Sequence, residues 1–329
     1  MQLKLRLKKS LIAAAVAIPM LVTSQSLVSG WSSDAFAADF PSKPIKVIIP
    51  FKPGGRTDTV ARLIGKKIKE NGWLSQPFVV VNMPGAGGAN AARGLFDGDS
   101  DGHTLVHWHH QMLIASAMGI VDFDPSAFTS IGYTGGGSPI WAVHKDSEFK
   151  TLADLVDYLK ANPEGLVEAV GIGTIPHFVG AQLKDAAGIK TRLVTANSGA
   201  DRIRLLSGKN ADIALFSASE YLKSGKKHMR ALVYFGRERL PNMPDVPTAT
   251  ELGYDVVWAN PNWWLTAKNA PPENVAILAA ALEKAINDPE MQEYFKTNTL
   301  APYWTPGPEA MTDAVDTLEK LKPIAAGIK

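Results

Sequence analysis

The sequence predicts an α/β fold with two lobes, each made of a mainly parallel sheet flanked by helices. Short apolar runs alternate with helical patterns along the chain, and this alternation is typical of parallel strands connected by helices. The chain has 329 residues, and the portion after residue 37 is longer than one hydrophobic core usually covers. Several predicted strands end in glycine-containing loops. These observations together favour two α/β lobes.

The chain is expected to begin its fold with two strand–loop–helix units. In the first, the strand Ile45–Ile49 leads into the loop Pro50–Gly55 and a helix that opens at Arg56. In the second, the strand Phe78–Val81 leads into the loop Asn82–Gly88 and a helix of small residues. The first helix carries its apolar residues on one face, which is formed by Val60, Leu63, Ile64 and Ile68.

Further strands and helices are predicted along the rest of the chain. Residues 104–108 read as a third strand, and Thr151 is placed to cap a helix with an apolar stripe beginning at Leu152. Two more strand–loop pairs are expected at residues 168–174 and 191–199. Two amphipathic helices close the chain, with apolar faces formed by Leu278, Leu282 and Ile286 and by Met311, Val315, Leu318 and Leu321.

The two N-terminal loops predict an anion-binding site. Glycine after a strand lets the backbone approach a ligand closely, and the helix that follows presents free N–H groups and the positive end of its dipole. Two such loops side by side bind an anion without a catalytic side chain. The sequence therefore indicates a receptor for an organic acid.

The N-terminal residues predict a cleavable secretory signal peptide, residues 1–37. Lys4, Arg6, Lys8 and Lys9 precede an apolar run too short for a comfortable membrane span, and Ala35-Phe36-Ala37 forms a small-residue cleavage site. Cleavage after Ala38 is the near alternative. Removal of this segment changes the formal net charge from +2 to about −1, because it takes away four basic residues and Asp34.

Composition excludes several classes of protein. No basic stripe remains after cleavage to suggest a nucleic-acid partner. The chain has no cysteine, which excludes disulfides, thiolate metal sites, a cysteine nucleophile and a lipid anchor on cysteine. No later segment has the length of a spanning helix, so transport across a membrane is expected to need other proteins.

A set of short motifs resembles the Bug family, the periplasmic receptors of tripartite tricarboxylate transporters. The resemblance covers nearly the whole chain after the signal peptide. The motifs that carry it are Phe40–Ile45, Pro50–Asp58, Asn82–Gly88, Asp101–Leu105, Leu240–Thr248, and Trp264-Leu265 before the helix start at Pro271-Pro272.

The resemblance implies a two-lobed periplasmic binding protein of the Venus-flytrap type, which is not an enzyme. Lobe 1 would comprise residues 38–141 and 261–329, and lobe 2 residues 142–260. The implied ligand is a small di- or tricarboxylate or an aromatic acid, held between the lobes without a cofactor. The implied partners are the large and small membrane subunits of a transporter, and the receptor itself is expected to be a periplasmic monomer without a lipid anchor.

The first loop supplies most of the candidate ligand-binding residues: Phe51, Gly54, Gly55, Arg56, Thr57 and Asp58. The alternative for the glycines is an ordinary turn, and for Asp58 a carboxylate that complements the helix dipole. The family usually has a small or apolar residue where this chain has Arg56. A guanidinium there is suited to a bidentate contact with a carboxylate, or else it is a solvated arginine on the rim.

The remaining candidates come from the second loop, the third strand and lobe 2: Gly85, Ala86, Gly87, Gly88, His107, Trp108, Thr174, Asn197, Ser198 and Gly199. The second loop resembles a dinucleotide fingerprint only superficially, since the third small residue would fall at Asn90. In lobe 2 the chain departs from the family, because the usual tyrosine and lysine are missing near Val194–Gly199. The ligand therefore does not carry over from the family.

His107, His109 and His110 lack a carboxylate or further histidine at metal-ligand spacing, so no metal site is predicted. Five tryptophans lie near the expected lobe crossings; Trp263 and Trp264 are expected to pack the lobes, whereas Trp108 or Trp141 facing the ligand would favour an aromatic acid.

Two other functions stay open. One is a sensor that presents the ligand to a signalling receptor, and the other is an α/β hydrolytic enzyme, although the chain lacks the local motifs of the common hydrolases.

Overall fold

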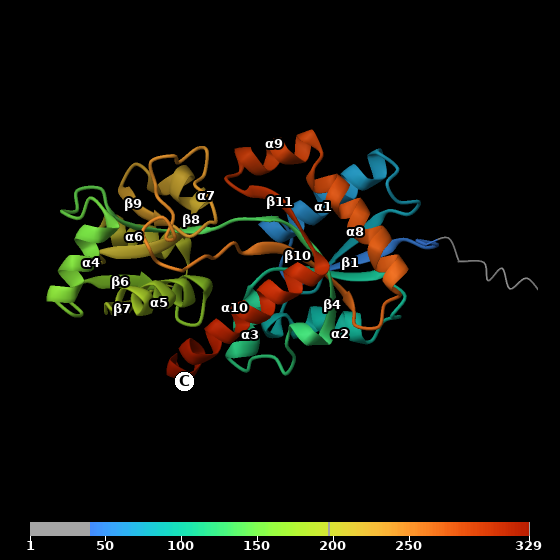
Figure 1. The fold of residues 1–329 in the computed structure, drawn as a ribbon, viewed down its shortest axis with the longest axis horizontal. Coiled ribbons are helices and arrows are strands. Elements are labelled where there is room, and N and C mark those ends of the chain that lie inside the picture. Colours follow the sequence, from blue (N-terminus) through green and yellow to red (C-terminus); the bar gives the residue numbers. More distant parts are fainter. Residues whose placement is uncertain (1–39, 197, 329) are drawn as a thin grey trace, which may run out of the picture. The chain divides into compact units, whose positions relative to one another are not determined.

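The computed structural model describes residues 40–196 and 198–328. The predicted signal peptide, residues 1–37, and the candidate residue Asn197 lie outside the described residues. In the described part the chain forms two β-sheets with helices around each, so the predicted α/β class is confirmed (Figure 1). No helix of this part combines the length and the apolar composition that a membrane crossing requires.

The first sheet has six strands in the order β11-β4-β10-β3-β1-β2. Strands β1, β2 and β3 are mutually parallel, whereas β10, β4 and β11 join the sheet in antiparallel pairs. The first strand is formed by residues with strong β preference and is buried along most of its length. The bounds of the six strands are β1 (Ile45–Ile49), β2 (Phe78–Asn82), β3 (Thr104–Trp108), β4 (Phe128–Gly136), β10 (Pro261–Ala267) and β11 (Ala301–Pro306).

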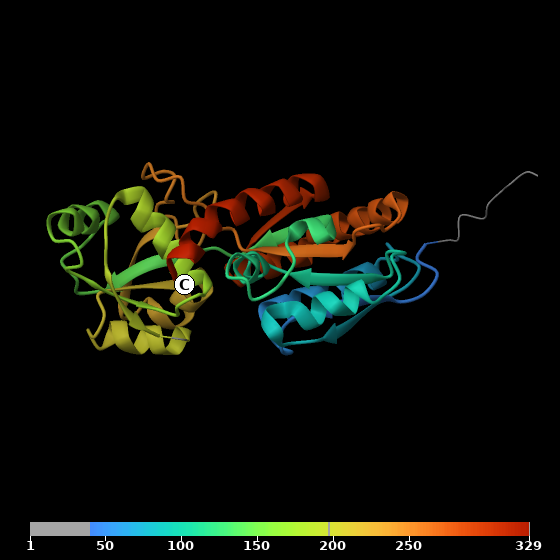
Figure 2. The same cartoon turned by 90° about the horizontal axis from the view of Figure 1, so that it is seen from below.

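Helices cover both faces of this first sheet (Figures 1 and 2). The buried sides of α1 and α8 share one hydrophobic cluster, in which Val60, Ile64 and Ile68 take the places predicted for them. Helices α2, α3 and α10 pack into the cluster on the other face. The elements are α1 (Arg56–Glu70), η1 (Ala86–Gly88), α2 (Ala89–Phe96), α3 (Gln111–Ala117), η2 (Pro125–Ala127), α8 (Pro272–Ile286), α9 (Pro289–Thr297) and α10 (Gly307–Ile328).

The second sheet has five strands in the order β7-β6-β8-β5-β9. Strands β7, β6 and β8 are parallel, and β5 lies antiparallel between β8 and β9. Thr151 caps α4 through a reciprocal capping box with Asp154, as its position predicts. The elements are β5 (Pro139–His144), α4 (Leu152–Ala161), β6 (Val167–Val170), α5 (Ile175–Ala187), β7 (Arg192–Thr195), α6 (Gly199–Ser207), β8 (Ile213–Ser217), α7 (Ala218–Glu220), η3 (Tyr221–Gly225) and β9 (Met229–Tyr234).

Both sheets are therefore mixed, whereas the sequence predicts mainly parallel sheets. The antiparallel pairs involve the strands next to the connections between the sheets: β4 ends at Gly136, β5 begins at Pro139, and β10 follows the return segment 235–260. A strand that enters a sheet directly from another sheet has no crossover helix, so it is not constrained to run parallel to its neighbours. Sequence periodicity does not contain this information, because the direction of a strand leaves no mark on its apolar pattern.

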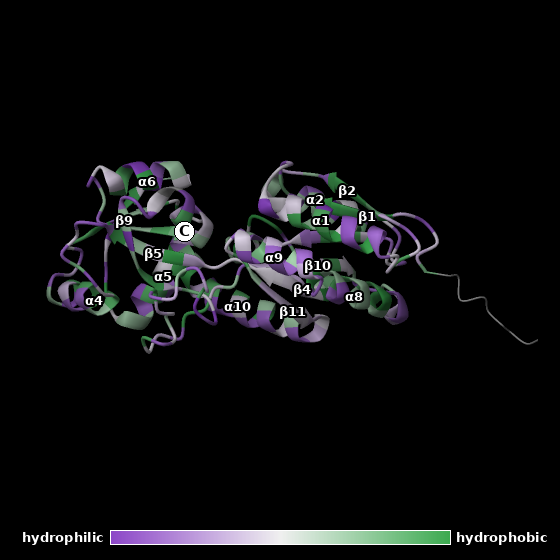
Figure 3. Cartoon of the chain, turned by 90° about the horizontal axis from the view of Figure 1, so that it is seen from above, coloured by the Kyte–Doolittle hydropathy of each residue, from purple (hydrophilic) through white to green (hydrophobic). Residues whose placement is uncertain are grey.

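Hydropathy follows the layers of the fold (Figure 3). Strands such as β1 and β5 are largely green, and their side chains are almost fully buried. Trp263 and Trp264 in β10 are fully buried, and their indole N–H groups donate to Ser130 Oγ at 2.9 Å and Thr134 Oγ1 at 2.7 Å. Both tryptophans thus pack the core of the first sheet and are not exposed to a ligand.

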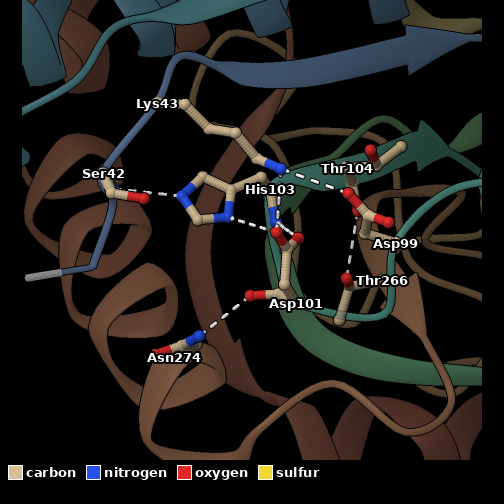
Figure 4. Close-up of polar contacts among 8 residues, drawn as sticks. All are labelled: Ser42, Lys43, Asp99, Asp101, His103, Thr104, Thr266 and Asn274. Carbon is tan, nitrogen blue, oxygen red and sulfur yellow. Dashed lines mark hydrogen bonds and ion pairs between the residues drawn. The ribbon is translucent and has the colours of Figure 1, made fainter. Parts of the chain in front are cut away.

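The Asp101–Thr104 motif has a structural role at the start of the fold (Figure 4). The Ser42 N–H donates to His103 Nε2 at 3.1 Å, and His103 Nδ1 lies 3.0 Å from Asp101 Oδ2. Lys43 forms an ion pair with the same Asp101 at 3.0 Å, and Asn274 Nδ2 donates to its carbonyl at 2.8 Å. These contacts fasten the segment before β1 to the loop before β3 and to the first turn of α8.

Candidate functional site

A cavity of about 710 Å³ lies where the two sheets' connecting segments meet. A volume of this size is typical of small-molecule sites. Its walls come from the loop after β1, the first turns of α1 and α5, the segment β8–η3, the return segment and the end of α9. The lining residues are Phe51, Gly54, Gly55, Arg56, Thr57, Thr59, His109, Gly137, Ser138, Pro139, Ile175, Pro176, Arg202, Leu215, Ser217, Ala218, Ser219, Glu220, Lys223, Trp258, Asn260, Tyr294, Asn298, Thr299 and Leu300.

The loop after β1 is held in shape by Asp58. Gly54 has φ +86°, a conformation that disfavours other residues, and its N–H donates to Asp58 Oδ2 at 3.0 Å. Asn82 Nδ2 donates to Asp58 Oδ1 at 3.0 Å, and Arg62 forms an ion pair with Asp58 at 2.9 Å. Burial acts to raise the pKa of Asp58, but the hydrogen bonds from Arg62, Gly54 and Asn82 outweigh it and lower the pKa to about 2. Asp58 is buried beneath the loop and does not line the cavity.

Arg56 is partly buried at the wall of the cavity, in the first turn of α1. Its Nη2 donates to the carbonyl oxygen of Asn260 at 3.0 Å, which ties it to the return segment. Burial lowers the pKa of Arg56 to about 10, opposed by Tyr303 and Tyr294, so the side chain stays charged at neutral pH. Among the described residues Arg56 takes part in no ion pair within 4.0 Å. A charged guanidinium without an acidic partner is available to bind an anion.

Two helix N-termini border the same cavity. The N-cap of α1 is Gly55, which has no side chain, and the N-cap of α5 is Thr174, whose hydroxyl makes no capping bond. By contrast, the side chains of Thr151 and Ser198 cap α4 and α6. The first-turn N–H groups of α1 and α5 are therefore free of side-chain acceptors from their own caps, and such groups favour a bound anion.

The charged residues of the cavity wall are mainly basic. Arg56, Arg202 and Lys223 line it together with one carboxylate, Glu220. The same wall is otherwise built from apolar and neutral polar groups. This excess of positive charge, next to two helix N-termini, gives the cavity the electrostatic character of a carboxylate site.

A larger cavity of about 930 Å³ lies between α5 and α10, but its charged side chains give no excess of positive charge. Arg237, one of its cations, is already paired with Asp313 at 3.2 Å. Acidic side chains outnumber basic ones there by four to three; the charged residues are Lys184, Asp185, Arg237, Asp255, Asp313, Asp316 and Lys320. The smaller cavity is therefore the better anion site, despite its size.

The second glycine loop is not part of this cavity wall. Gly88 has φ +102°, and a Cβ built on it would fall 1.9 Å from Trp108 Cζ2. Similarly, a Cβ on Gly87 would fall 2.6 Å from Ile120 Cγ2, and one on Gly85 2.8 Å from Asn90 Nδ2. The glycines of Gly85–Gly88 are thus required by close packing of the chain itself. A part in ligand binding for these three glycines and Ala86 stays a prediction.

The residues at the end of β3 are arranged differently from the expectation. Trp108 is fully buried under Gly88, and His107 is fully buried with its ring stacked on Trp264 at 4.1 Å. His109, one residue beyond the strand, lines the cavity and stacks on Phe51 at 4.7 Å. Neither Trp108 nor Trp141 lines this cavity, so the arrangement that would favour an aromatic acid is not seen here. Trp141 is fully buried, and its Nε1 donates to Glu168 at 3.2 Å.

The candidate residues of the second sheet are partly engaged in local contacts. Thr174 Oγ1 donates to the Gly171 carbonyl at 2.6 Å, and Ser198 Oγ accepts from Asp201 N at 3.1 Å as the cap of α6. Gly199 lies against Glu220. None of these three lines the cavity, whereas the neighbours Ile175 and Pro176 do. Within the described ranges, no group of three or more His, Asp and Glu side chains is arranged to hold a metal ion.

Sequence reasoning missed several residues of the wall, above all Arg202, Lys223 and Asn260. Arg202 lies in an ordinary amphipathic helix, where an arginine is usually solvated. His109 had a usable signal, because it directly follows a strand that is parallel to β1 and ends at the same edge of the sheet.

The buried histidines predict acid sensitivity. Burial lowers the pKa of His107 and of His110 to about 3, and the positive charge of Arg56 acts in the same direction. Between pH 6.5 and 3 the unfolded chain therefore binds more protons than the folded chain, so stability is lost as the pH falls. From pH 6.5 to pH 5.0 we expect each histidine to lower the unfolding free energy by up to about 2 kcal/mol.

Urea unfolding followed by circular dichroism at the two pH values measures this loss. In the double variant His107→Gln with His110→Gln, the loss of unfolding free energy between pH 6.5 and pH 5.0 should be smaller by most of the contribution expected from the two histidines. A wild-type protein whose stability is unchanged between the two pH values would contradict the assignment of neutral buried histidines.

Comparison with known proteins identifies the class to which this fold and site belong. Residues 60–329 match the model of the "Tripartite tricarboxylate transporter family receptor", and the chain belongs to this family. It is a periplasmic solute-binding protein of the Bug type, so the resemblance noted in the sequence is confirmed.

Individual relatives cover most of the chain. A protein from the gbd 5′ region of Cupriavidus necator is 28% identical, with 89% of each chain covered. Protein BugT of Bordetella pertussis is 27% identical over 83% of this chain and 86% of its own.

Among solved structures, a TctC solute-binding protein from Polaromonas has the same fold, with a TM-score of 0.79 at 22% identity, covering 88% of this chain and 99% of that one. MatC of Rhodopseudomonas palustris, solved with bound malate, has a TM-score of 0.63 at 25% identity, with the same coverage.

Proposed function

We propose that this protein binds a small organic carboxylate in the 710 Å³ cavity and delivers it to a tripartite tricarboxylate-type membrane transporter. The observation that carries the proposal is Arg56, a partly buried guanidinium at the N-terminus of α1 that faces the cavity without an acidic partner among the described residues. MatC, a relative with bound malate, supports a carboxylate as the ligand class.

The carboxylate would bind to the first turn of α1 and to Arg56. Gly55 and Thr57 would bring backbone N–H groups to it, Gly54 would shape the turn of the loop, and Phe51 would cover one side. Asp58 would act indirectly by fixing the loop through Gly54 N–H and Asn82. The other sequence-derived candidates remain predictions: Gly85, Ala86, Gly87, Gly88, His107, Trp108, Thr174, Asn197, Ser198 and Gly199.

Ligand binding is proposed to bring two lobes together. Lobe 1 would consist of residues 38–141 and 261–329, and lobe 2 of residues 142–260. The distribution of strands between the sheets supports this division, since β1–β4, β10 and β11 form one sheet and β5–β9 the other. Trp141 lies within β5, so the first boundary would fall a few residues earlier, near Gly137. Closure would let the ligand contact both lobes and so shift the open–closed equilibrium.

The partners of the proposed function are the large and small membrane subunits of the transporter. The receptor would be secreted by the signal peptide 1–37 and act in the periplasm as a monomer. It would return its ligand unchanged, because the proposal assigns no catalytic step. A sensor that presents the same ligand to a signalling receptor would use the same cavity, and only the partner protein distinguishes the two functions.

A thermal-shift panel tests the ligand class. The protein starting at residue 38 would be unfolded and refolded to remove carried-over ligand, then heated with citrate, C4 dicarboxylates, acidic amino acids, and aromatic mono- and diacids. A carboxylate at 100 times its dissociation constant adds about 2.7 kcal/mol of stability, which raises the midpoint by a few degrees. If a well-folded protein responds to none of these acids, the carboxylate assignment is wrong.

A further inference from the structure

A second arginine faces the cavity from the other sheet. Arg202 lies on α6 with only 8% of its surface exposed, and it lines the same cavity as Arg56. Its guanidinium carbon is 5.8 Å from the centroid of the Phe216 ring, which supports it from one side. Its Nε atom is buried and has no hydrogen-bond partner within the described part of the chain.

The two acidic side chains near Arg202 make their hydrogen bonds with other residues, and none with Arg202. Glu220 Oε2 accepts from the N–H and the hydroxyl of Ser217, both at 2.9 Å. Asp201 accepts from Ser198 Oγ at 2.7 Å and lies 3.9 Å from Arg204. Neither carboxylate comes within ion-pair distance, 4.0 Å, of the Arg202 guanidinium.

Burying a guanidinium that keeps a donor without an acceptor costs folding free energy, and a bound anion removes this cost by accepting the hydrogen bond. Burial lowers the pKa of Arg202, and the charges of Glu220 and Asp201 oppose this only in part. The arrangement therefore resembles that of Arg56, because in both cases a charged donor at the cavity wall lacks an acidic partner. The difference is that Arg56 comes from the first sheet's α1 and Arg202 from the second sheet's α6.

We propose that Arg202 forms a second carboxylate subsite, so that the ligand is a dicarboxylate held between Arg56 and Arg202. This inference rests on the proposed function and narrows its ligand class. A dianion supplies one carboxylate to each guanidinium, in a planar fork geometry that arginine is suited to bind. A monocarboxylate satisfies one guanidinium and leaves the other without a partner.

With two subsites, the number of carboxylates on the ligand determines how strongly the ligand favours the closed form. A carboxylate that binds to Arg56 and the first turn of α1 occupies only the first sheet's side of the cavity. The contact with Arg202 is gained on the second sheet's side, so a ligand with a second carboxylate has more to gain in the closed form. Only such a difference in affinity between open and closed forms shifts their equilibrium.

Isothermal titration calorimetry with matched acids tests the inference. Succinate is compared with butyrate and adipate with hexanoate, on the wild type and on Arg202→Met. The matched control is Arg204→Met, two residues along the same helix, whose side chain is 72% exposed. We expect the wild type to prefer at least one dicarboxylate over its monocarboxylate by tenfold or more. In Arg202→Met that dicarboxylate should lose at least tenfold in affinity, the monocarboxylate less than twofold, and Arg204→Met should behave as the wild type.

The outcomes separate this inference from the proposed function. A wild type that binds mono- and dicarboxylates equally well overturns the second subsite but leaves a carboxylate receptor. A wild type that binds no carboxylate overturns both. If Arg202→Met does not fold, Arg202→Lys is measured instead. Lysine keeps the positive charge but lacks the planar pair of donors of arginine, so we expect it to reduce the preference for the dicarboxylate. An unchanged preference for the dicarboxylate in a folded Arg202→Met excludes the subsite, and so does an unchanged preference in Arg202→Lys if Arg202→Met does not fold.

Discussion

Replacing Arg56 by methionine is expected to weaken binding of the carboxylate by about 10- to 100-fold. A hydrogen bond to a charged group contributes about 1.5–3 kcal/mol, and tenfold in affinity corresponds to about 1.4 kcal/mol. Arg56 lines the cavity and is free of acidic partners among the described residues. Methionine keeps much of the side-chain length while it removes every donor. Calorimetric titration with the acid found in the thermal-shift panel measures the loss.

Two further variants make this result specific. Lys52→Met removes a positive charge from the same loop, but Lys52 is exposed and does not line the cavity, so its effect should stay within about twofold. Gly55→Val adds a side chain where an added Cβ meets nothing closer than 4.0 Å, so it should disturb the ligand more than the fold. Loss of binding in Gly55→Val together with normal binding in Arg56→Met would mean that the backbone alone captures the acid, and the role given to Arg56 would be wrong.

Replacing Lys184 by methionine is expected to destabilise the protein by about 3–5 kcal/mol, because it leaves a buried carboxylate unpaired. Glu168 in β6 is 1% exposed, and Lys184 Nζ in α5 lies 2.5 Å from its Oε2. Thr191 Oγ1 donates to the same oxygen at 2.9 Å, and Trp141 Nε1 donates to Oε1 at 3.2 Å. The ammonium supplies the charge that compensates this carboxylate, and the neutral donors cannot replace it.

Urea unfolding of three variants checks this account. Lys184→Met alone should show the full loss, whereas Lys190→Met, an exposed lysine just after the same helix, should lose less than about 0.5 kcal/mol. The double variant Glu168→Gln with Lys184→Met removes both charges and should recover much of the stability. A double variant that is no more stable than Lys184→Met would show that the lysine acts by packing rather than by charge.

Local signals in the sequence predicted the elements that build the first half of the site. The strand β1, the glycine loop after it and the apolar face of α1 lie where they were predicted. Each of these depends on residues close together in the chain, so periodicity and turn chemistry suffice to identify them. The capping box at Thr151 belongs to the same group.

Features that depend on distant residues escaped this reasoning. Helix α9 and strand β11 were not predicted, and the antiparallel strands that make both sheets mixed leave no trace in local patterns. Arg202 and Arg204 are two residues apart in one helix, yet one is buried at the cavity and the other is exposed. Helical periodicity places them on opposite faces of α6, but only the packing of α6 against β8 shows that the face with Arg202 borders the cavity, and that packing is a tertiary property.

The most direct test of the central claim is hydrogen–deuterium exchange with and without the saturating acid. The central claim is that a carboxylate binds at the first turn of α1 beside Arg56. Residues 54–59 should exchange more slowly when the acid is bound, and so should residues 217–220 on the opposite wall of the cavity. Slower exchange confined to α5 and α10, which border the 930 Å³ cavity, with residues 54–59 unchanged, would contradict this claim.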